Sequence, residues 1–378
     1  MLRFFTAGES HGKCLTGIIE AFPSNVPIDI RKIDQDLKRR QMGYGRGARM
    51  NIEQDRIEIL SGIRGGKTLG SPIAFQIENR DYTNWEQHMH PIVTPDESRK
   101  ITKPRPGHAD LIGALKYNFS DIRNVLERSS ARETAVRVAL GSMTAQFMSC
   151  FGINVVSHVT AIGNISLEEN IWDIEQIGAA DQSPVRCVDK TTEEQMISLI
   201  QETKDAGDSL GGIFEIHITG VPVGLGSYVH WDRKLDAKLA YNLMSIQGIK
   251  CVEIGEGSRN TALKGSEVHD EIFYDTKNGY YRKTNRAGGI EGGMSNGENI
   301  IIRCFMKPIP TLYKPLQSVD IETKESFMAA VERSDTCAVP AASIVGEMVA
   351  ITVIAEEFLR KYGGDSLEEI TERWKRCR

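Results

Sequence analysis

The sequence contains no Cys-x-x-Cys pair, no linker rich in serine, proline or glycine, and no low-complexity tract. Its seven cysteines are scattered and odd in number, which predicts reduced thiols in a cytoplasmic protein. Because no linker divides the 378 residues, we expect residues 1–378 to form a single domain, although the length alone also allows two closely packed ones.

Long hydrophobic runs are also scarce. The apolar residues that precede Gly8 are too few for a signal peptide, and we expect no segment as long as a membrane span. Export and membrane insertion are therefore not expected.

Basic charge is limited overall, with 46 Lys and Arg against 51 Asp and Glu, for a net charge of -5. This balance argues against a protein devoted to nucleic acid. Residues 31–49 are an exception, because they carry seven basic side chains and only two acidic ones. A local positive field in an acidic protein indicates an anionic ligand.

Apolar periodicity predicts helices mixed with antiparallel-looking strands, which together indicate a layered α+β fold. Residues 161–194 and 260–283 are interpreted as excursions from this scaffold. Residues 340–359 are apolar nearly all round, so their helix is expected to be central. The predicted helices are 29–41, 111–119, 192–206, 232–246 and 340–362, and the predicted strands are 16–22, 57–62, 73–78, 154–162, 212–220 and 299–306.

Three side chains are notable within these elements. Arg40 falls on the inward stripe of its helix, where an arginine needs an anion. Ser130 and Glu133 form a capping-box pattern, and the helix that they open offers an anion site at its amino end. His217 falls on the polar side of its strand and is interpreted as a surface histidine.

Three remote segments combine acid, base or arginine side chains with turn residues. They are residues 8–12, 105–110 and 332–335. The glycines of residues 8–12 allow a ligand to approach the backbone closely, and His108 at a helix start is suited to proton transfer. The alternatives are a structural turn at 8–12, a packing or N-cap role for His108, and exposed salt bridges at 332–335.

Two further segments are rich in glycine or proline. Residues 285–297 match neither a Walker nor a dinucleotide fingerprint, yet their glycines allow amides to lie against a ring or phosphate, and a mobile loop is equally compatible. Residues 307–311 follow a strand and are stiffened by two prolines, which suits ligand positioning. His88 and His90 lack a third ligand, so a surface loop is favoured over a metal site.

Taken together, these segments resemble the chorismate synthase family over nearly the whole chain. The resemblance rests on seven motifs in the family's order: 6–12, 39–47, 105–110, 127–133, 288–297, 307–311 and 333–335. It implies conversion of 5-enolpyruvylshikimate 3-phosphate to chorismate and phosphate by a 1,4-elimination. The reaction belongs to the shikimate pathway of aromatic amino acid biosynthesis and requires reduced FMN without net redox change.

The resemblance also implies residue roles. His11 would protonate the leaving phosphate, and His108 would protonate or stabilise the reduced flavin near N1. Asp335, with Ser10 and Ser129, would draw the proton from flavin N5. Arginines suit a substrate with two carboxylates and a phosphate, because guanidinium groups bind such oxyanions bidentately. The implied substrate ligands are Arg40, Arg46, Arg49, Arg105, Arg132 and Arg333.

For the flavin, the resemblance points to residues from five segments. They are Arg128, Ser129, Ser130, Gln247, Gly248, Gly292, Lys307, Pro308, Ile309, Pro310, Thr311 and Arg333. Gly248 departs from the family's commoner alanine, so this contact is the least secure. The family folds as a β-α-β sandwich, with long helices between two antiparallel sheets and internal pseudo-symmetry, and assembles as homotetramers.

Several alternatives stay open at this point. Some family members reduce their own flavin with NADPH, and Arg40 and Arg46 are also compatible with nicotinamide contacts. The chain has no segment resembling a reductase domain, so we expect an external flavin reductase or reductant. Two other functions are alternatives. A nucleic-acid binder is disfavoured because the arginines of this chain are not interleaved with aromatic residues for base stacking. A flavoprotein oxidoreductase would consume NADPH in proportion to product.

Overall fold

The computed structural model describes residues 2–47, 54–94, 97–168, 173–277, 279–314, 316–329 and 335–377. Two predicted site residues, Arg49 and Arg333, lie outside these ranges. Within them the chain combines long helices with antiparallel sheets, so the predicted α+β class is confirmed. All seven cysteines fall in the described ranges and are free thiols, as predicted.

The first part of the chain forms a four-stranded antiparallel sheet. Its order is β1 (Arg3–Ala7), β2 (Cys14–Glu20), β6 (Ile73–Glu78) and β3 (Ile57–Ile59). Alternate residues of β2 and β6, such as Leu15, Ile19 and Phe75, are fully buried, as the two-residue period of a half-buried strand requires. Helix α4 (Thr134–Ser149) packs on β2 and β6.

A five-stranded antiparallel sheet forms from the later part of the chain. Its order is β10 (Ile249–Ile254), β15 (Ile300–Met306), β9 (Gly212–Thr219), β7 (Asn154–Ile162) and β8 (Ile165–Ser166). Helix α9 (Val339–Tyr362) packs on β7 and β9, and α7 (Leu235–Met244) packs on α9 and β10. Phe214 and Ile216 of β9 contact α9 at Gly346 and are fully buried.

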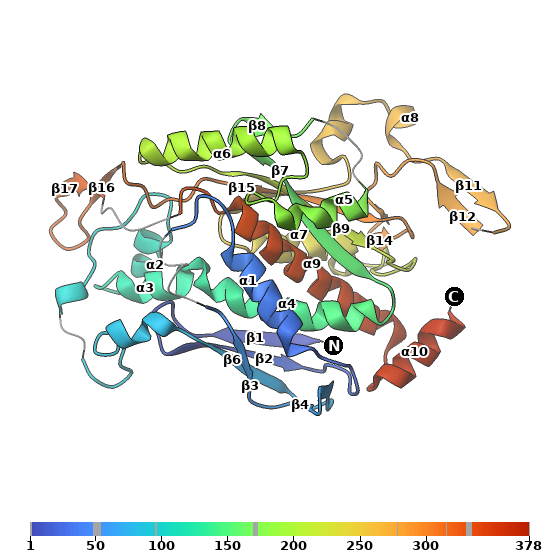
Figure 1. The fold of residues 1–378 in the computed structure, drawn as a ribbon, viewed down its shortest axis with the longest axis horizontal. Coiled ribbons are helices and arrows are strands. Elements are labelled where there is room, and N and C mark those ends of the chain that lie inside the picture. Colours follow the sequence, from blue (N-terminus) through green and yellow to red (C-terminus); the bar gives the residue numbers. More distant parts are fainter. Residues whose placement is uncertain are drawn as a thin grey trace.

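Helices α1 (Ile30–Gln41), α4 and α9 pack on one another between the two sheets (Figure 1). The approach of α4 to α9 is close because Gly141 has no side chain. A Cβ atom placed there would lie 2.3 Å from Cβ of Met348. Helix α9 has 24 residues and is long and apolar enough to span a membrane, so the expectation about segment length was wrong. It is nevertheless buried inside the protein, which confirms it as the predicted central helix.

The remaining elements lie around these layers. The other helices are α2 (Asp110–Tyr117), α3 (Arg123–Ser129), α5 (Ile174–Ala179), α6 (Lys190–Asp205), α8 (Gly265–Val268) and α10 (Leu367–Arg376). Short 3-10 helices cover 80–84, 97–99, 131–133, 180–182, 231–233 and 257–262. The short hairpins are β4 (Ile63–Arg64) with β5 (Lys67–Thr68), β11 (Ile272–Asp275) with β12 (Gly279–Arg282), β13 (Ile290–Glu291) with β14 (Met294–Ser295), and β16 (Gln317–Val319) with β17 (Ser326–Met328).

Most predicted elements exist, with ends shifted by a few residues, but two local interpretations were wrong. Ser130 caps a 3-10 turn by accepting from the Arg132 amide, and α4 begins only at Thr134, so the capping box with Glu133 does not form. His217 is buried rather than on the surface, at 7% exposure, and binds Glu215. The outer face of this sheet therefore holds buried polar groups that a simple inside-outside alternation does not anticipate.

Candidate active site

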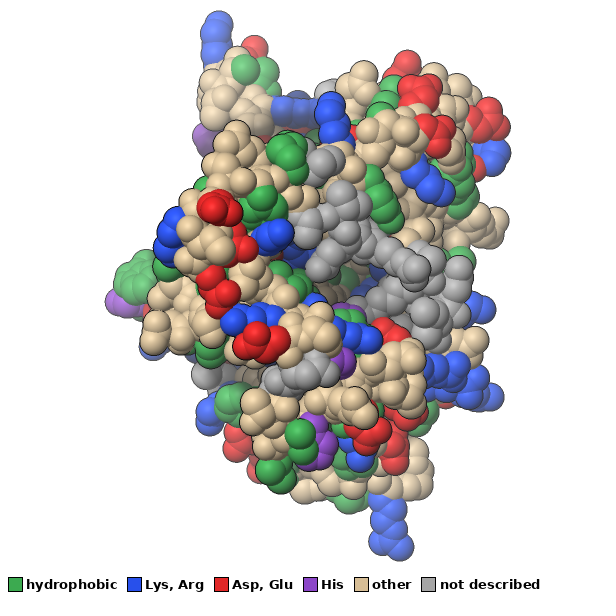
Figure 2. Space-filling model, turned by 90° about the vertical axis from the view of Figure 1, so that its left-hand side faces the viewer, with side chains coloured by type: hydrophobic (Ala, Val, Ile, Leu, Met, Phe, Trp, Pro, Cys, Tyr) green, Lys and Arg blue, Asp and Glu red, His purple; other side chains and the backbone are tan. Residues whose placement is uncertain are grey.

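A cavity of ≈ 900 Å³ lies where α1 ends and where α4 and α9 begin. This volume is near the upper end of the roughly 300–1,000 Å³ typical of ligand pockets, which leaves room for more than one small molecule. Lys, Arg and His side chains gather around a hollow near the centre of the face in Figure 2. The positive ends of two helices and these side chains favour an anionic ligand.

The cavity brings together most of the site residues predicted from sequence. Its predicted lining residues are Ser10, His11, Arg40, Arg46, Arg105, His108, Ser129, Ser130, Arg132, Gln247, Gly248, Lys307, Pro308, Ile309, Pro310, Thr311 and Asp335. Arg128 and Gly292 are not among the described lining residues. Arg128 instead donates to the backbone oxygens of Thr6 and Gly8, and Gly292 lies in the turn between β13 and β14.

His11 is held on two sides. Its backbone amide donates to Oε2 of Glu127 at 2.7 Å, and its Nδ1 is 2.8 Å from Oε1 of the same carboxylate. Burial raises the pKa of Glu127, but its hydrogen bonds and charge interaction with His11 outweigh this, so the pKa is lowered and the group stays a carboxylate. With Nδ1 occupied in this way, Nε2 is the nitrogen available to a ligand.

Trp85 supports the other side of the His11 ring. The two rings stack with centroids 4.1 Å apart and an interplanar angle of 26°. The guanidinium groups of Arg99 and Arg123 lie 4.0 and 4.7 Å from the indole centroid. The histidine is therefore fixed between a carboxylate and an indole that itself binds two cations.

Replacing Trp85 by alanine is expected to lower kcat/KM about tenfold, since His11 loses its stacking partner. Trp85→Phe should retain most of the activity because the stack survives. Trp231→Ala is a matched control, because Trp231 is 74% exposed and lies beside His230 rather than in the cavity. Steady-state assays of the three variants would test this. Wild-type kcat/KM in Trp85→Ala would remove Trp85 from the site.

Two predicted substrate arginines share a buried carboxylate. Arg40 donates from Nη2 to Oδ2 of Asp55 at 2.8 Å, and Arg132 donates from Nη1 to Oδ1 at 2.5 Å. All three are at least nine-tenths buried. Arg132 also donates to Oδ1 of Asn79 at 2.9 Å. The anion that Arg40 requires is thus supplied in part by Asp55, which was not predicted from sequence.

Asp335 interacts with the loop that follows α1. Its Oδ2 is 2.8 Å from Nη1 of Arg46, and its Oδ1 accepts from the Gly47 amide at 2.6 Å. The carboxylate therefore lies in the cavity wall beside a cation. Ser10 is 2% exposed and its hydroxyl accepts from Ser130 at 3.2 Å, whereas the Ser129 hydroxyl is directed to the Leu126 carbonyl at 3.5 Å.

Arg105 and His108 lie together at the start of α2. Asp110 accepts from Nε of Arg105 at 2.9 Å and is hydrogen-bonded to Nδ1 of His108. Burial raises the pKa of Asp110, but its hydrogen bonds with His108 and Arg105 outweigh this and lower it well below its usual range. Nη1 of Arg105 donates to Thr311 at 2.9 Å, which links this turn to residues 307–311.

Gln247 and Gly248 form the opposite wall with Met306 and Lys307. The Gln247 amide nitrogen donates to Oε1 of Glu133 at 2.9 Å, and its buried Oε1 has no hydrogen-bond partner among the described residues. Gly248 has φ +85, and a Cβ atom there would lie 3.0 Å from Cε of Met306. Glycine at this position thus fits the local backbone, where alanine would be strained.

Four residues of the site were not anticipated from the sequence. Asp55, Trp85, Asp110 and Glu127 hold the arginines and histidines in place, as described above. Asp110 and Glu127 lie inside motifs already singled out, two residues from His108 and Ser129 in the sequence. This closeness could have identified them as site residues. Asp55 lies in a segment without a distinctive pattern, and Trp85 lies just before the two histidines of residues 88–90. Only the fold brings Trp85 to the cavity and Asp55 to the two arginines.

The histidines of residues 88–90 lie in a loop, and we still interpret them as loop residues rather than as part of a metal site. Nδ1 of His90 accepts from the backbone amides of Ile92 and Val93 at 3.2 and 3.1 Å. This nitrogen therefore stabilises a turn. Among the described residues, the group that could hold a metal ion lies elsewhere, on the five-stranded sheet.

Comparisons with known proteins cover the whole chain. A family model described as chorismate synthase matches residues 2–359. A relative named chorismate synthase from Alkaliphilus metalliredigens (strain QYMF) is 68% identical over 375 residues, which are 99% of each chain. Another so named, from Alkaliphilus oremlandii (strain OhILAs), is 55% identical over 377 residues, covering 100% of this chain and 98% of the relative.

The structural comparison gives the same answer. A crystal structure of chorismate synthase aligns with a TM-score of 0.81 and 41% sequence identity, over 100% of this chain and 97% of that one. This identity is high enough, over the full length, to carry the family as well as the fold. The chain belongs to the chorismate synthase family, lyases of the shikimate pathway.

Proposed function

We propose that this chain converts 5-enolpyruvylshikimate 3-phosphate to chorismate and phosphate by a 1,4-elimination in the cavity described above, with reduced FMN as cofactor. The observation that carries the proposal is the convergence of Arg40, Arg46, Arg105 and Arg132 with two histidines on one cavity. A substrate with two carboxylates and a phosphate requires such a set, because each guanidinium binds an oxyanion through paired N–H groups.

The wall formed by Gln247 fits a flavin. Arg137 and the Gln247 amide both bind Glu133, so Glu133 acts as an acceptor and the Gln247 nitrogen faces it. The buried Gln247 oxygen then needs a donor, which a ring N–H of a flavin provides. Gly248 and Met306 leave a close, apolar approach for a planar ring. The further FMN ligands that we propose are Ser129, Ser130 and Lys307 to Thr311. Outside this wall they are Arg128, Gly292 and Arg333.

When bound in this cavity, reduced FMN would lend electron density to the substrate without net redox change. The residues of the protein hold and transfer the protons of the reaction. His11, fixed at Nδ1 by Glu127, is proposed to protonate the leaving phosphate from Nε2. His108, bound to Asp110, is proposed to hold a proton next to the flavin, and Asp335 with Ser10 and Ser129 to accept one. The arginines, including Arg49, orient the substrate.

Replacing Gln247 by methionine is expected to weaken FMN binding about three- to tenfold, because the side chain keeps its length but loses the acceptor oxygen. Binding of oxidised FMN, followed by quenching of flavin fluorescence, measures this without turnover. Gln76→Met is a matched control, since the Gln76 amide also donates to a glutamate, Glu58, on the first sheet. Equal affinity in wild type and Gln247→Met would contradict the proposed flavin wall.

The proposal extends to the organisation of the enzyme. We propose one cytoplasmic domain over residues 1–378 with the family's β-α-β sandwich and internal pseudo-symmetry, assembled as a homotetramer without a membrane or nucleic-acid partner. An external reductase or reductant would supply reduced FMN. The layered packing of the two sheets on α4 and α9 supports the sandwich architecture.

The test is an anaerobic assay of the purified protein with chemically reduced FMN and 5-enolpyruvylshikimate 3-phosphate. Phosphate and chorismate should form in equal amounts, with many turnovers per reduced flavin. Consumption of one reduced flavin per product would instead indicate a flavin oxidoreductase. Failure to form chorismate under these conditions would reject the proposed activity.

A further inference from the structure

A second cluster of ionisable side chains lies on the outer face of the five-stranded sheet, away from the cavity. His158 on β7 pairs directly across from Glu215 on β9, and Glu215 pairs across from Arg303 on β15. His217 follows on β9, two residues from Glu215 and on the same face. None of these residues is among the lining residues of the cavity.

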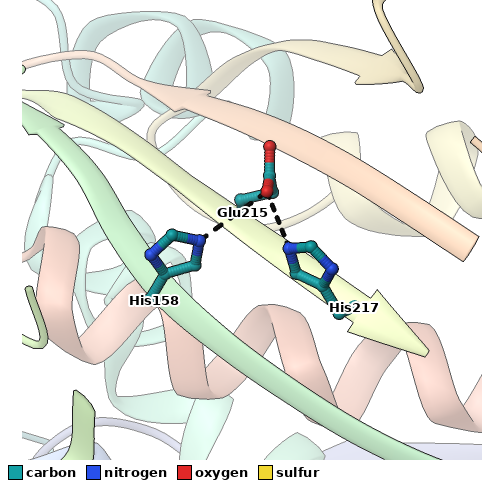
Figure 3. A group of neighbouring side chains, drawn as sticks. All are labelled: His158, Glu215 and His217. Atoms are coloured by element: carbon teal, nitrogen blue, oxygen red, sulfur yellow. Dashed lines mark hydrogen bonds and ion pairs between the residues drawn. The ribbon is translucent and has the colours of Figure 1, made fainter. Parts of the chain in front are cut away.

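The two histidines flank one carboxylate oxygen (Figure 3). Nε2 of His217 lies 2.7 Å from Oε1 of Glu215, and Nε2 of His158 lies 3.6 Å from the same oxygen. One ligand atom from each residue lies within 4.8 Å of the others. These separations bracket the edge of roughly 3.3 Å expected for a tetrahedron with metal–ligand bonds of about 2.0–2.1 Å.

The His158 imidazole has an unusual environment. It is 1% exposed, and neither ring nitrogen has a hydrogen-bond partner among the described residues. A buried polar group without a hydrogen bond is costly and calls for a partner such as a water or an ion.

Glu215 is oriented for an additional partner at Oε1. Its Oε2 accepts from Nε of Arg303 at 2.8 Å, which fixes the carboxylate plane. Arg303 in turn lies 3.8 Å from Glu253 on β10, and this second carboxylate offsets its charge. Oε1 is the carboxylate oxygen nearest to both histidine rings. Arg303 thus acts as an orienting group behind a ligand.

We propose that His158, Glu215 and His217 form a binding site for a divalent cation of the zinc class, separate from the active site. Two imidazoles and one carboxylate are ligands that Zn²⁺ and Co²⁺ prefer, whereas Mg²⁺ and Ca²⁺ prefer all-oxygen sites. Because the site joins β7 to β9, the cation would stabilise this sheet.

The test uses the full-length protein after chelation, titrated with Co²⁺ and followed by visible absorption and calorimetry. The expected result is one Co²⁺ per chain in a nitrogen- and oxygen-ligated site, with competition by Zn²⁺. His158→Gln and His217→Gln should each weaken binding more than about tenfold. His230→Gln, which alters an exposed histidine paired with Asp232, should leave binding unchanged.

Several results would overturn the proposal. The absence of Co²⁺ binding is one, and equal affinity in wild type and in both glutamine variants is another. A sulfur-to-cobalt absorption band is the third, because it would assign the metal to exposed thiols such as Cys251 or Cys377. A measurement on wild-type crystals does not depend on the folding of variants. Anomalous diffraction after soaking in Zn²⁺ should place a peak between the three side chains, and its absence there would contradict the site.

Discussion

Replacing Asp55 by asparagine is expected to lower the free energy of unfolding by about 3–5 kcal/mol, because it leaves two buried guanidinium groups without their carboxylate. The Asp55 side chain has 0% exposure and binds Arg40 and Arg132 at the same time. The substitution retains shape and some hydrogen-bonding capacity, so the loss of charge is the main change. Urea unfolding at neutral pH measures the effect.

Asp29→Asn is the matched control for this measurement. Asp29 pairs with Arg31 on the exposed end of α1, and asparagine still caps a helix, so the free energy of unfolding should change far less than in Asp55→Asn. Phosphate should stabilise Asp55→Asn more than wild type, because an anion in the cavity replaces the missing carboxylate next to Arg40 and Arg132. Equal stability of wild type and Asp55→Asn would contradict the assignment of Asp55 as their counter-ion.

The effect of Asp55→Asn on the free energy of unfolding has a predictable pH dependence. Burial raises the pKa of Asp55, but Arg40 and Arg132 outweigh it and lower the folded-state pKa below the ordinary value of 3.8. The ion pair therefore contributes fully above the unfolded-state pKa and is lost as pH falls through the lower folded-state pKa. The stability gap between wild type and Asp55→Asn should be constant near neutral pH and shrink below about pH 4.

Replacing His11 by alanine is expected to lower kcat by about 10²–10⁴, the usual effect of losing a general acid. FMN affinity should change little, because Gln247 and its neighbours form a different wall of the cavity. Anaerobic turnover and fluorescence titration separate the two effects. His230→Ala provides a control at an exposed histidine that also has an aspartate partner.

Glu127→Gln distinguishes proton transfer from simple packing around His11. Glutamine can still contact His11 and retains the shape of Glu127, but it lacks the carboxylate charge beside the ring, so kcat should fall while the fold is preserved. Anaerobic turnover and far-UV circular dichroism of Glu127→Gln measure these two properties. Turnover of His11→Ala within a factor of about three of wild type would remove His11 from the mechanism.

The sequence predicted the scaffold well where periodicity was strong. Residues 73–78 and 154–162 are strands with the predicted ends, and the apolar stretch 340–362 became the buried helix α9. Strand β1 was missed because its side chains are largely exposed and give no alternating signal. Helix α10 was also missed, although Leu367, Ile370 and Trp374 recur at helical spacing and pack on the core.

The site was predicted as a set of candidate residues rather than as a network. The inward position of Arg40 followed from helix geometry, but its partner Asp55 is 15 residues away in a segment without a pattern. Trp85 contacts His11 only because the fold brings residues 11 and 85 together. The error on His217 has a related cause. Alternation predicts the face of a strand but not whether neighbouring strands bury that face, and His158 and Glu215 do so here.

The central claim is that one cavity holds FMN and the substrate together, with the flavin against Gln247 and the substrate against the arginines. A crystal structure of the complex with FMN and 5-enolpyruvylshikimate 3-phosphate tests this most directly. The account predicts the isoalloxazine ring beside Gln247 and Met306 and the acidic groups of the substrate on Arg40, Arg46, Arg105 and Arg132. Flavin bound outside this cavity, or a substrate that contacts none of these arginines, would contradict it.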